Sequence, residues 1–234
     1  MSRRASTDAR IERRTLGHSV QGRPIELIRF GPGRHPRLIL AGIHGDEPKS
    51  VYLANRLCED LAGPGDVPTA WSVLVVPVVN PDGYAVRKRR NANGVDLNRN
   101  FPTPDWSAGR RRSRFFGGTD PASEPETLIV IDLIERVRPA DIITVHSISD
   151  GRHCNNHDGP AAVAEQLAQA MADLNGYPVT STIGYSTPGS FGTWAGRELG
   201  IPMVTLELPS HHSPRRCWDT NRAALLADMS ETVR

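Results

Sequence analysis

Histidine and acidic side chains follow or interrupt three apolar segments that are typical of buried strands. His44 and Glu47 come directly after one segment, His146 ends a second, and Glu207 lies inside a third. A strand delivers its last residues to the edge of its sheet, where ligands bind in open α/β folds. We therefore expect these four side chains to lie close together.

Two histidines and one glutamate are typical ligands of a catalytic zinc ion that keeps an open fourth position. His44 and Glu47 are three residues apart at an expected strand-to-helix turn, so both can reach one point, and His146 could supply a third ligand. Each histidine taken alone is more often a hydrogen-bonded structural residue. The prediction of one bound Zn2+ therefore rests on the three residues together and on the polar loop described below.

Glu207 interrupts the apolar segment 204–208. A carboxylate is costly to bury there unless it is paired. One interpretation is a buried ion pair with an arginine. The other is a general base with a shifted pKa, placed near the metal.

A long polar stretch, residues 80–122, follows the strand expected at 71–79. It opens with Asn80-Pro81-Asp82-Gly83, which has the composition of a turn, and continues with many arginines and asparagines. Such groups suit the binding of a carboxylate or of a developing oxyanion. The alternative is a solvated basic surface, but a loop of this length is uncommon in a compact domain unless it is functional.

The remaining chain alternates apolar segments with helical patterns. We expect strands at 25–30, 37–41, 71–79, 141–145 and 201–208, and helices at 48–61, 123–138 (with Ser123 as N-cap and Pro125 second in the helix), 160–174, 188–199 and 219–233. The strands have the composition of segments buried on both faces. This predicts an α/β fold, with a mixed or parallel central sheet between helices.

Composition limits the function classes. The chain has 234 residues, suited to a flexible tail at 1–15 and a single domain at 16–234, and its net charge of +2 gives no argument for nucleic acid or membrane partners. No apolar run is long enough for a signal peptide or a membrane span. Cys58, Cys154 and Cys217 make a poor disulfide framework, so a cytoplasmic, reduced protein is expected. The oligomeric state is not readable.

These motifs resemble those of the zinc metallocarboxypeptidases, peptidase family M14. His44-Gly45-Asp46-Glu47 is similar to the family's first zinc motif, and His146 is similar to its second zinc histidine. Residues 91–101, Asn-Ala-Asn-Gly-Val-Asp-Leu-Asn-Arg-Asn-Phe, are a highly specific match. The resemblance covers nearly the whole chain after Leu16 and implies a three-layer α/β/α fold with a mixed sheet.

The resemblance also implies roles for further residues. Tyr185, Trp194 and Glu207 keep the family's mutual spacing. The resemblance implies that Glu207 is the catalytic glutamate and that Tyr185 is the tyrosine that closes over the substrate. It implies that Arg89, with Arg90 as competing candidate, polarises the scissile carbonyl. It also implies that Asn98 and Arg99 bind a terminal carboxylate and that Asp96 orients a zinc histidine.

Within this family the likeness is greatest to amidases that cut the bond between γ-D-glutamate and meso-diaminopimelate in murein peptides. It rests on residues 184–194, on the helix start at 123–127 and on the short chain. A small murein peptide is therefore the expected partner. Gly192 lies where digestive carboxypeptidases place the residue that sorts side chains, so selectivity must come from elsewhere.

Three other functions stay open: a general peptide carboxypeptidase, a deacylase of the desuccinylase or aspartoacylase type, and a peptide-binding protein with an inactive site. The full motif at 91–101 argues against the deacylase, and the complete set of zinc ligands argues against the inactive protein. The basic, aromatic segment 110–116 is expected to form a surface loop near the site. His211, His212 and Arg215 could line the cleft.

Overall fold

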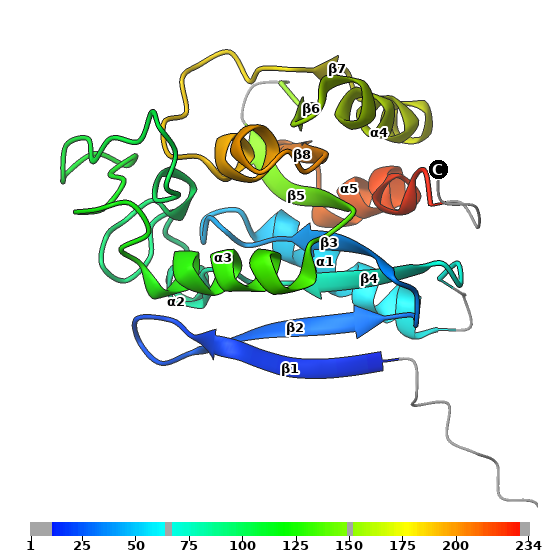
Figure 1. The fold of residues 1–234 in the computed structure, drawn as a ribbon, viewed down its shortest axis with the longest axis horizontal. Coiled ribbons are helices and arrows are strands. Elements are labelled where there is room, and N and C mark those ends of the chain that lie inside the picture. Colours follow the sequence, from blue (N-terminus) through cyan, green and yellow to red (C-terminus); the bar gives the residue numbers. More distant parts are fainter. Residues whose placement is uncertain (1–10, 64–66, 149–151, 230–234) are drawn as a thin grey trace, which may run out of the picture.

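The structure, a computed structural model, describes residues 11–63, 67–148 and 152–229. Within these ranges, eight strands form one mixed sheet in the order β1-β2-β4-β3-β5-β8-β6-β7 (Figure 1). The strands are β1 (Ile11–His18), β2 (Pro24–Phe30), β3 (His35–Leu40), β4 (Trp71–Val76), β5 (Asp141–Ile148), β6 (Cys154–Asp158), β7 (Val179–Thr180) and β8 (Met203–Pro209). The α-helices are α1 (Pro48–Ala62), α2 (Pro81–Ala85), α3 (Pro125–Val137), α4 (Ala161–Asn175) and α5 (Pro214–Asn221). Further helical segments of other types are η2 (Leu97–Arg99), η3 (Gly192–Glu198) and η4 (Ala224–Leu226).

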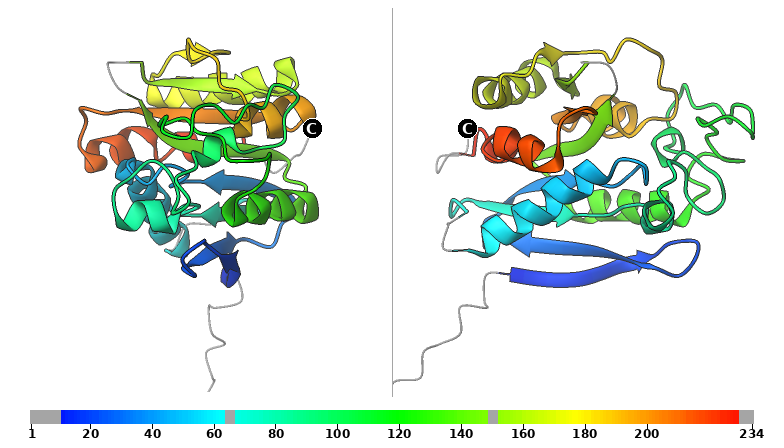
Figure 2. Two further views of the ribbon diagram at one scale, coloured as in Figure 1. Left: turned by 90° about the vertical axis from the view of Figure 1, so that its left-hand side faces the viewer. Right: turned by 180° about the vertical axis from the view of Figure 1, so that it is seen from behind.

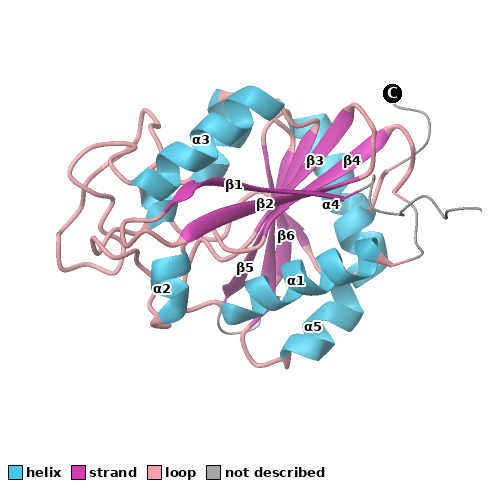
Figure 3. Cartoon of the chain, turned by 90° about the horizontal axis from the view of Figure 1, so that it is seen from below, coloured by secondary structure: helices cyan, strands magenta, loops and turns pink. Residues whose placement is uncertain are grey.

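Helices cover both faces of the sheet, which confirms the predicted three-layer α/β/α architecture (Figure 3). Successive residues of a strand point to opposite faces, so each central strand contributes to two cores. On one face, Val75 packs with Leu57 of α1 and with apolar residues of α4 and α5. On the other face, Val76 packs with Leu133 of α3 and with Trp194 of η3.

The four central strands, β4, β3, β5 and β8, run parallel to one another. Their carboxyl ends therefore lie at one edge of the sheet, and the segments that follow β3, β4 and β5 leave from that edge. The loop that follows α2 forms a lobe beside this edge, at the left of Figure 1 and seen from two further sides in Figure 2. This arrangement brings the predicted site residues toward one place.

The prediction of a flexible tail at 1–15 is wrong for residues 11–15, which belong to β1. This strand pairs antiparallel with β2 at the edge of the sheet, and Glu12, Arg13 and Arg14 are exposed. Its polar composition therefore gave no strand signal. β6 was missed for the same reason, since Cys-Asn-Asn-His-Asp has no apolar alternation. Residues 1–10 lie outside the described ranges.

The predicted helix at 219–233 is also wrong in its bounds. Helix α5 begins at Pro214, where the Ser213 side chain accepts a hydrogen bond from the backbone N–H of Arg216 (3.2 Å). Serine followed by proline is a helix-start signal. The helix ends at Asn221, and only η4 follows; residues 230–233 lie outside the described ranges.

Other boundaries differ in smaller ways. The N-cap of α3 is Glu124, not Ser123, so Pro125 occupies the first helical position rather than the second. The Ser123 hydroxyl donates to the Glu124 carboxylate instead (2.8 Å). The predicted helix at 188–199 is the π-helix η3, and the strand predicted at 71–79 ends at Val76. No helix in the described ranges is long and apolar enough to cross a bilayer.

Candidate active site

His44, Glu47 and His146 meet at the carboxyl edge of the sheet, and all three are buried. Nδ1 of His44 lies 2.8 Å from one carboxylate oxygen of Glu47. Nδ1 of His146 lies 3.1 Å from the other carboxylate oxygen and 3.2 Å from Nδ1 of His44. The strands β3 and β5 are neighbours, so the turn after β3 carries His44 and Glu47 directly to His146. His146 does not end its strand as predicted, since β5 continues for two residues to Ile148.

This donor set fits a zinc ion. Two Nδ1 atoms that face each other cannot both point a proton along the same line, whereas a cation between them would use both lone pairs. The second ring nitrogen of His44, Nε2, lies 3.0 Å from Oδ1 of Asp96. A proton on Nε2, donated to Asp96, leaves Nδ1 free for the metal, as is usual for metal-binding histidines. Two histidines and a glutamate also leave a coordination position open.

The electrostatics of the cluster favour charged carboxylates at two positions. Burial alone would raise the pKa of Glu47, but His44 and His146 hold it well below its ordinary value. Burial opposes the charge of Asp96 as well, and there His44 and Arg89 lower the pKa. Both carboxylates are therefore ionised and can hold a cation and its histidine ligand.

Glu207 lies on β8 directly opposite His146 in the parallel register with β5. It is 6% exposed, and burial raises the pKa of its carboxyl to about 7, despite His146. No hydrogen bond or ion pair of this carboxylate occurs among the residues that the structure describes. The alternative of a buried ion pair is thus not seen there, and the carboxyl is free to accept a proton.

The structure separates the two competing arginines. Nε of Arg89 donates to Oδ2 of Asp96 (2.9 Å), and a terminal nitrogen of Arg89 lies 3.6 Å from Glu47. Arg90 instead donates to the backbone carbonyls of Arg111 (3.3 Å) and Ser113 (3.2 Å). Arg89 therefore belongs to the cluster, and Arg90 anchors the lobe.

Asn98 and Arg99 lie in η2, whose first turn is capped by Asp96. Oδ1 of Asn98 accepts from the backbone N–H of Phe191 (2.8 Å), which fixes the orientation of the amide. Among the described residues its amide nitrogen makes no hydrogen bond, so it can donate to a ligand. Arg99 is buried, and burial lowers the pKa of its guanidinium, although Tyr185 and Asp96 act in the opposite direction.

Tyr185 is 45% exposed and lies on the loop between β7 and η3. It lines a polar cavity of about 220 Å³ together with Asn98, Glu207 and Gly192. The structure thus brings Tyr185 to the same space as the catalytic candidates. The loop position leaves the side chain room to move toward a ligand.

Two predicted motifs meet through their glycines. A Cβ atom placed on Gly45 would lie 2.0 Å from the backbone carbon of Gly83. Residues 80–83, predicted as a turn, are the N-cap and first residues of helix α2. The turn that carries His44 and the start of α2 therefore pack backbone against backbone, which only glycine permits. Asn80 completes this contact, since its side chain caps Gly83 N–H (2.8 Å) and donates to the carbonyl of Arg89 (3.2 Å).

Sequence reasoning missed the residues that support the loop at 91–101. Nδ2 of Asn91 donates to the buried carboxylates of Glu124 (2.7 Å) and Glu126 (3.0 Å) at the start of α3. Nδ2 of Asn100 donates to the carbonyl of Gly117 (2.8 Å), and its Oδ1 accepts from Glu124 N–H (3.2 Å). The Asn-rich motif and the Ser-Glu-Pro-Glu helix start were the available signals, but only the fold shows that they bond to each other.

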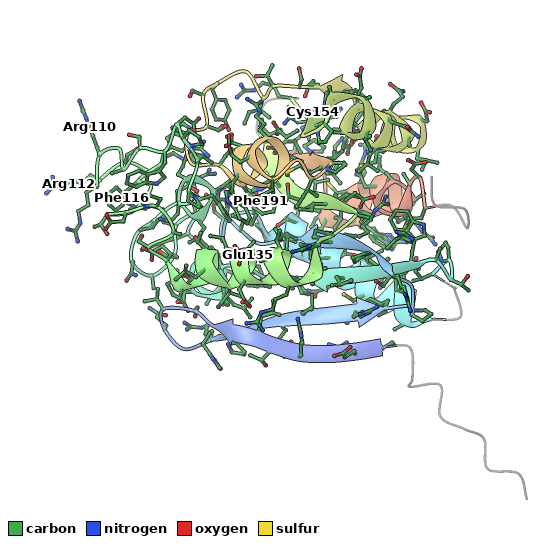
Figure 4. All side chains as sticks on the ribbon, in the orientation of Figure 1. Arg110, Arg112, Phe116, Glu135, Cys154 and Phe191 are labelled. Atoms are coloured by element: carbon green, nitrogen blue, oxygen red, sulfur yellow. The ribbon has the colours of Figure 1, made fainter. Side chains whose placement is uncertain are left out.

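The unassigned segment 110–116 forms the outer part of the lobe. Arg110 and Arg112 point away from the body of the protein, whereas Phe116 is buried (Figure 4). The ring of Phe115 lies against the guanidinium carbons of both Arg89 (5.3 Å) and Arg99 (5.4 Å). This segment therefore contacts two of the predicted site residues.

The residues after β8 are arranged differently. The rings of His211 and His212 stack edge to face, 4.4 Å apart, and exposed Arg215 lies 3.7 Å from Asp219 on α5. Neither contact involves the metal cluster.

Comparison with known proteins places these features in a family. The sequence profile of Peptidase M14, zinc carboxypeptidase, matches residues 2–216. Murein peptide amidase A of Escherichia coli (strain K12) is 38% identical over 211 residues, which cover 82% of this chain and 79% of that protein. Murein peptide amidase A of Vibrio campbellii is 32% identical over 83% of this chain and 78% of that protein.

Solved structures agree. Murein-tripeptide amidase MpaA from Escherichia coli O157 superposes with a TM-score of 0.74 at 32% identity, over 92% of this chain and 90% of that one. Bovine thrombin-activatable fibrinolysis inhibitor, in complex with tick carboxypeptidase inhibitor, shares the fold with a TM-score of 0.79 at 23% identity, over 93% of this chain and 88% of that one. With its cluster of His44, Glu47 and His146, the chain belongs to the zinc carboxypeptidase family, Peptidase M14, as a hydrolase that uses one zinc ion.

Proposed function

We propose that this protein is a murein peptide amidase, which hydrolyses the amide bond between γ-D-glutamate and meso-diaminopimelate. The observation that carries the proposal is the similarity to murein peptide amidases, which extends over about four fifths of both chains. The polar cavity beside Glu207 supports it, because the leaving residue of this substrate has a charged side chain. An apolar pocket would suit a different substrate.

We assign the metal to His44, Glu47 and His146. Zinc, when bound there, supplies a Lewis acid that polarises the scissile carbonyl and lowers the pKa of a water ligand. Glu207 is the general base: it accepts the proton of the attacking water and then returns this proton to the leaving amine. Asp96 holds the Nε2–H of His44 and so fixes the tautomer that binds the metal.

The arginines and the amide of the site act on the substrate's own charges. Arg89, held by Asp96, donates to the oxygen of the carbonyl under attack, and one well-placed donor of this kind contributes about 3–4 kcal/mol in the transition state. Asn98 and Arg99 bind the carboxylate next to the scissile amide, which positions the amide for attack. Tyr185 closes over the bound peptide and excludes water.

We infer that the chain from Ile11 of β1 onward, rather than from residue 16, acts as a single catalytic domain, and that the enzyme recycles murein peptides in the cytoplasm. One continuous sheet with a core on each face supports the first inference. Three free, buried cysteines, Cys58, Cys154 and Cys217, suit a reducing compartment and support the second.

The test is release of meso-diaminopimelate from L-Ala-γ-D-Glu-meso-diaminopimelate by the zinc-loaded protein, measured with and without a chelator. A blocked dipeptide serves as the parallel substrate. Chelator-sensitive release from the tripeptide, with little action on the dipeptide, is the expected result. Cleavage of the dipeptide alone would identify a general carboxypeptidase instead, and no cleavage of either would contradict the proposal.

A further inference from the structure

The cavity beside Glu207 is also lined by an ion pair that the proposed mechanism does not use. Asp158, the last residue of β6, and Arg197, in η3, both line the cavity, as do Glu207 and Asn98. Asp158 on β6 is paired with Met203 on β8. Glu207 lies four residues further along β8, so its backbone is roughly 13 Å from that of Met203. The cavity therefore connects the general base to a second charged group.

Asp158 occupies the space that the glycines of η3 leave open. A Cβ atom on Gly192 would lie 2.7 Å from Oδ2 of Asp158, and one on Gly196 would lie 2.7 Å from its Cβ. A larger residue at either position would collide with the Asp158 side chain. Gly192 itself has no side chain that could select a ligand. The carboxylate of Asp158, which comes from β6, occupies the space next to Gly192 instead.

The ion pair leaves hydrogen-bonding capacity on both partners. Nε and one terminal nitrogen of Arg197 each lie 3.0 Å from the same oxygen of Asp158, Oδ1. Oδ2 accepts one weak hydrogen bond, from Asn156 (3.3 Å). Among the described residues, the other terminal nitrogen of Arg197 has no partner. One acceptor and one planar donor group therefore lie side by side.

Stability gives little reason for this pair. The Arg197 side chain is 61% exposed, and exposed ion pairs contribute little to folding. The Asp158 side chain is 10% exposed, and burial raises its pKa in spite of Arg197. A second cation next to Oδ2 would offset this unfavourable burial of charge.

We propose that Asp158 and Arg197 recognise the distal end of the leaving residue, where Asp158 accepts from an ammonium group and Arg197 binds a carboxylate. Their ligand class is a side chain that ends in a zwitterionic amino-acid group. An ammonium and a carboxylate on one carbon complement an adjacent carboxylate and guanidinium, with a charge-assisted hydrogen bond to each. This inference rests on the proposed function and names the residues that give it selectivity.

Binding of the free leaving amino acid tests the pair without turnover. Calorimetric titration of the zinc-loaded protein would compare meso-diaminopimelate with L-lysine, which lacks the distal carboxylate, and with L-2-aminopimelate, which lacks the distal amine. We expect the wild-type protein to bind meso-diaminopimelate at least about tenfold more tightly than either analogue. Equal affinity for all three would overturn the proposal.

Variants assign each half of the ligand. Asp158→Asn should abolish the preference for meso-diaminopimelate over 2-aminopimelate, and Arg197→Met should abolish the preference over lysine. Glu198→Gln, an exposed carboxylate next to Arg197, is the matched control and should keep both preferences. Because Arg197 is exposed, its variant keeps the test valid if Asp158→Asn fails to fold.

Two outcomes would place the selectivity elsewhere. Unchanged affinity ratios in folded variants at both positions would overturn the proposal. So would loss of the amine preference in Asp105→Asn alone, since Asp105 is another aspartate that lines the cavity. If the protein cleaves the tripeptide but the variants keep the wild-type affinity ratios, only the role of Asp158 and Arg197 is refuted. If the protein binds meso-diaminopimelate selectively but does not cleave the tripeptide, only the amidase function is refuted.

Discussion

His146 and Glu207 lie directly opposite each other on the adjacent parallel strands β5 and β8. One is a ligand of the proposed metal, and the other is the proposed base. Because the backbone hydrogen bonds of the central sheet fix this register, the base keeps a constant position relative to the metal cluster. The pairing predicts that the role of Glu207 can be separated from metal binding.

We expect Glu207→Gln to keep stoichiometric zinc and to lose turnover by several orders of magnitude, because glutamine keeps the shape of the side chain but cannot accept the proton. Metal analysis and kcat on the tripeptide would measure the two effects. Glu198→Gln, the same change on the surface, should leave both unchanged. Retained turnover in Glu207→Gln would exclude this residue as the base.

The same residue makes the metal-free protein sensitive to pH. Burial raises the pKa of Glu207 from 4.5 to about 7. The folded state therefore binds a proton that the unfolded chain has lost, and stability falls as pH rises from about 4.5 to 7, by on the order of 3 kcal/mol in total. Below pH 4.5 the carboxyl is protonated in both states and contributes no difference.

Glu207→Gln should therefore stabilise the metal-free protein at pH 8 and not at pH 4.5. Thermal unfolding of chelator-treated wild type and variant across this range would measure the difference. Bound zinc favours the carboxylate, so zinc-loaded samples should show a smaller gap. Parallel stability curves for the two metal-free proteins would contradict the predicted cost of burying this charge.

The sequence predicted the site better than the edges of the fold. His44, Glu47, His146 and Glu207 follow or interrupt strongly apolar strands, so both their strands and their common edge were readable. β1 and β6 were not, because β1 is an edge strand with exposed polar side chains, and β6 carries Asn156 and Asp158 toward the cavity. Apolar periodicity contains no signal for such strands.

The contacts between distant segments were not predictable either. Asp158 fills the space next to Gly192 because β6 lies against η3. No sequence pattern within either segment predicts that the two residues come this close. Similarly, the choice between Arg89 and Arg90 depends on Asp96, which is seven residues after Arg89 in the sequence. Asp96 accepts a hydrogen bond from Arg89 and makes none with Arg90 among the described residues. The spacing of residues in the sequence limited the candidate site residues to a few. The contacts in the folded structure then distinguished between them.

Asp96 should control metal affinity from behind His44. We expect Asp96→Asn to weaken zinc binding by about 10- to 100-fold, because the Nε2–H of His44 loses its charged acceptor. Competition with a fluorescent chelator would measure the dissociation constant. The control is Asp82→Asn, a buried aspartate that holds Ser19 (2.9 Å) and Arg23 (2.7 Å). It should lower thermal stability and leave zinc affinity unchanged; equal zinc affinity in both variants would refute the role of Asp96.

Phe115 should position the two site arginines. Its half-exposed ring contacts the guanidinium groups of Arg89 and Arg99, and each such contact is worth about 0.5–2 kcal/mol. We expect Phe115→Ala to lower kcat/KM for the tripeptide by about 3- to 30-fold with no change in zinc affinity, because both arginines become less ordered. The Phe115→Tyr variant keeps an aromatic face and should retain the wild-type kcat/KM. If alanine and tyrosine variants match the wild type, the lobe merely covers these arginines without orienting them.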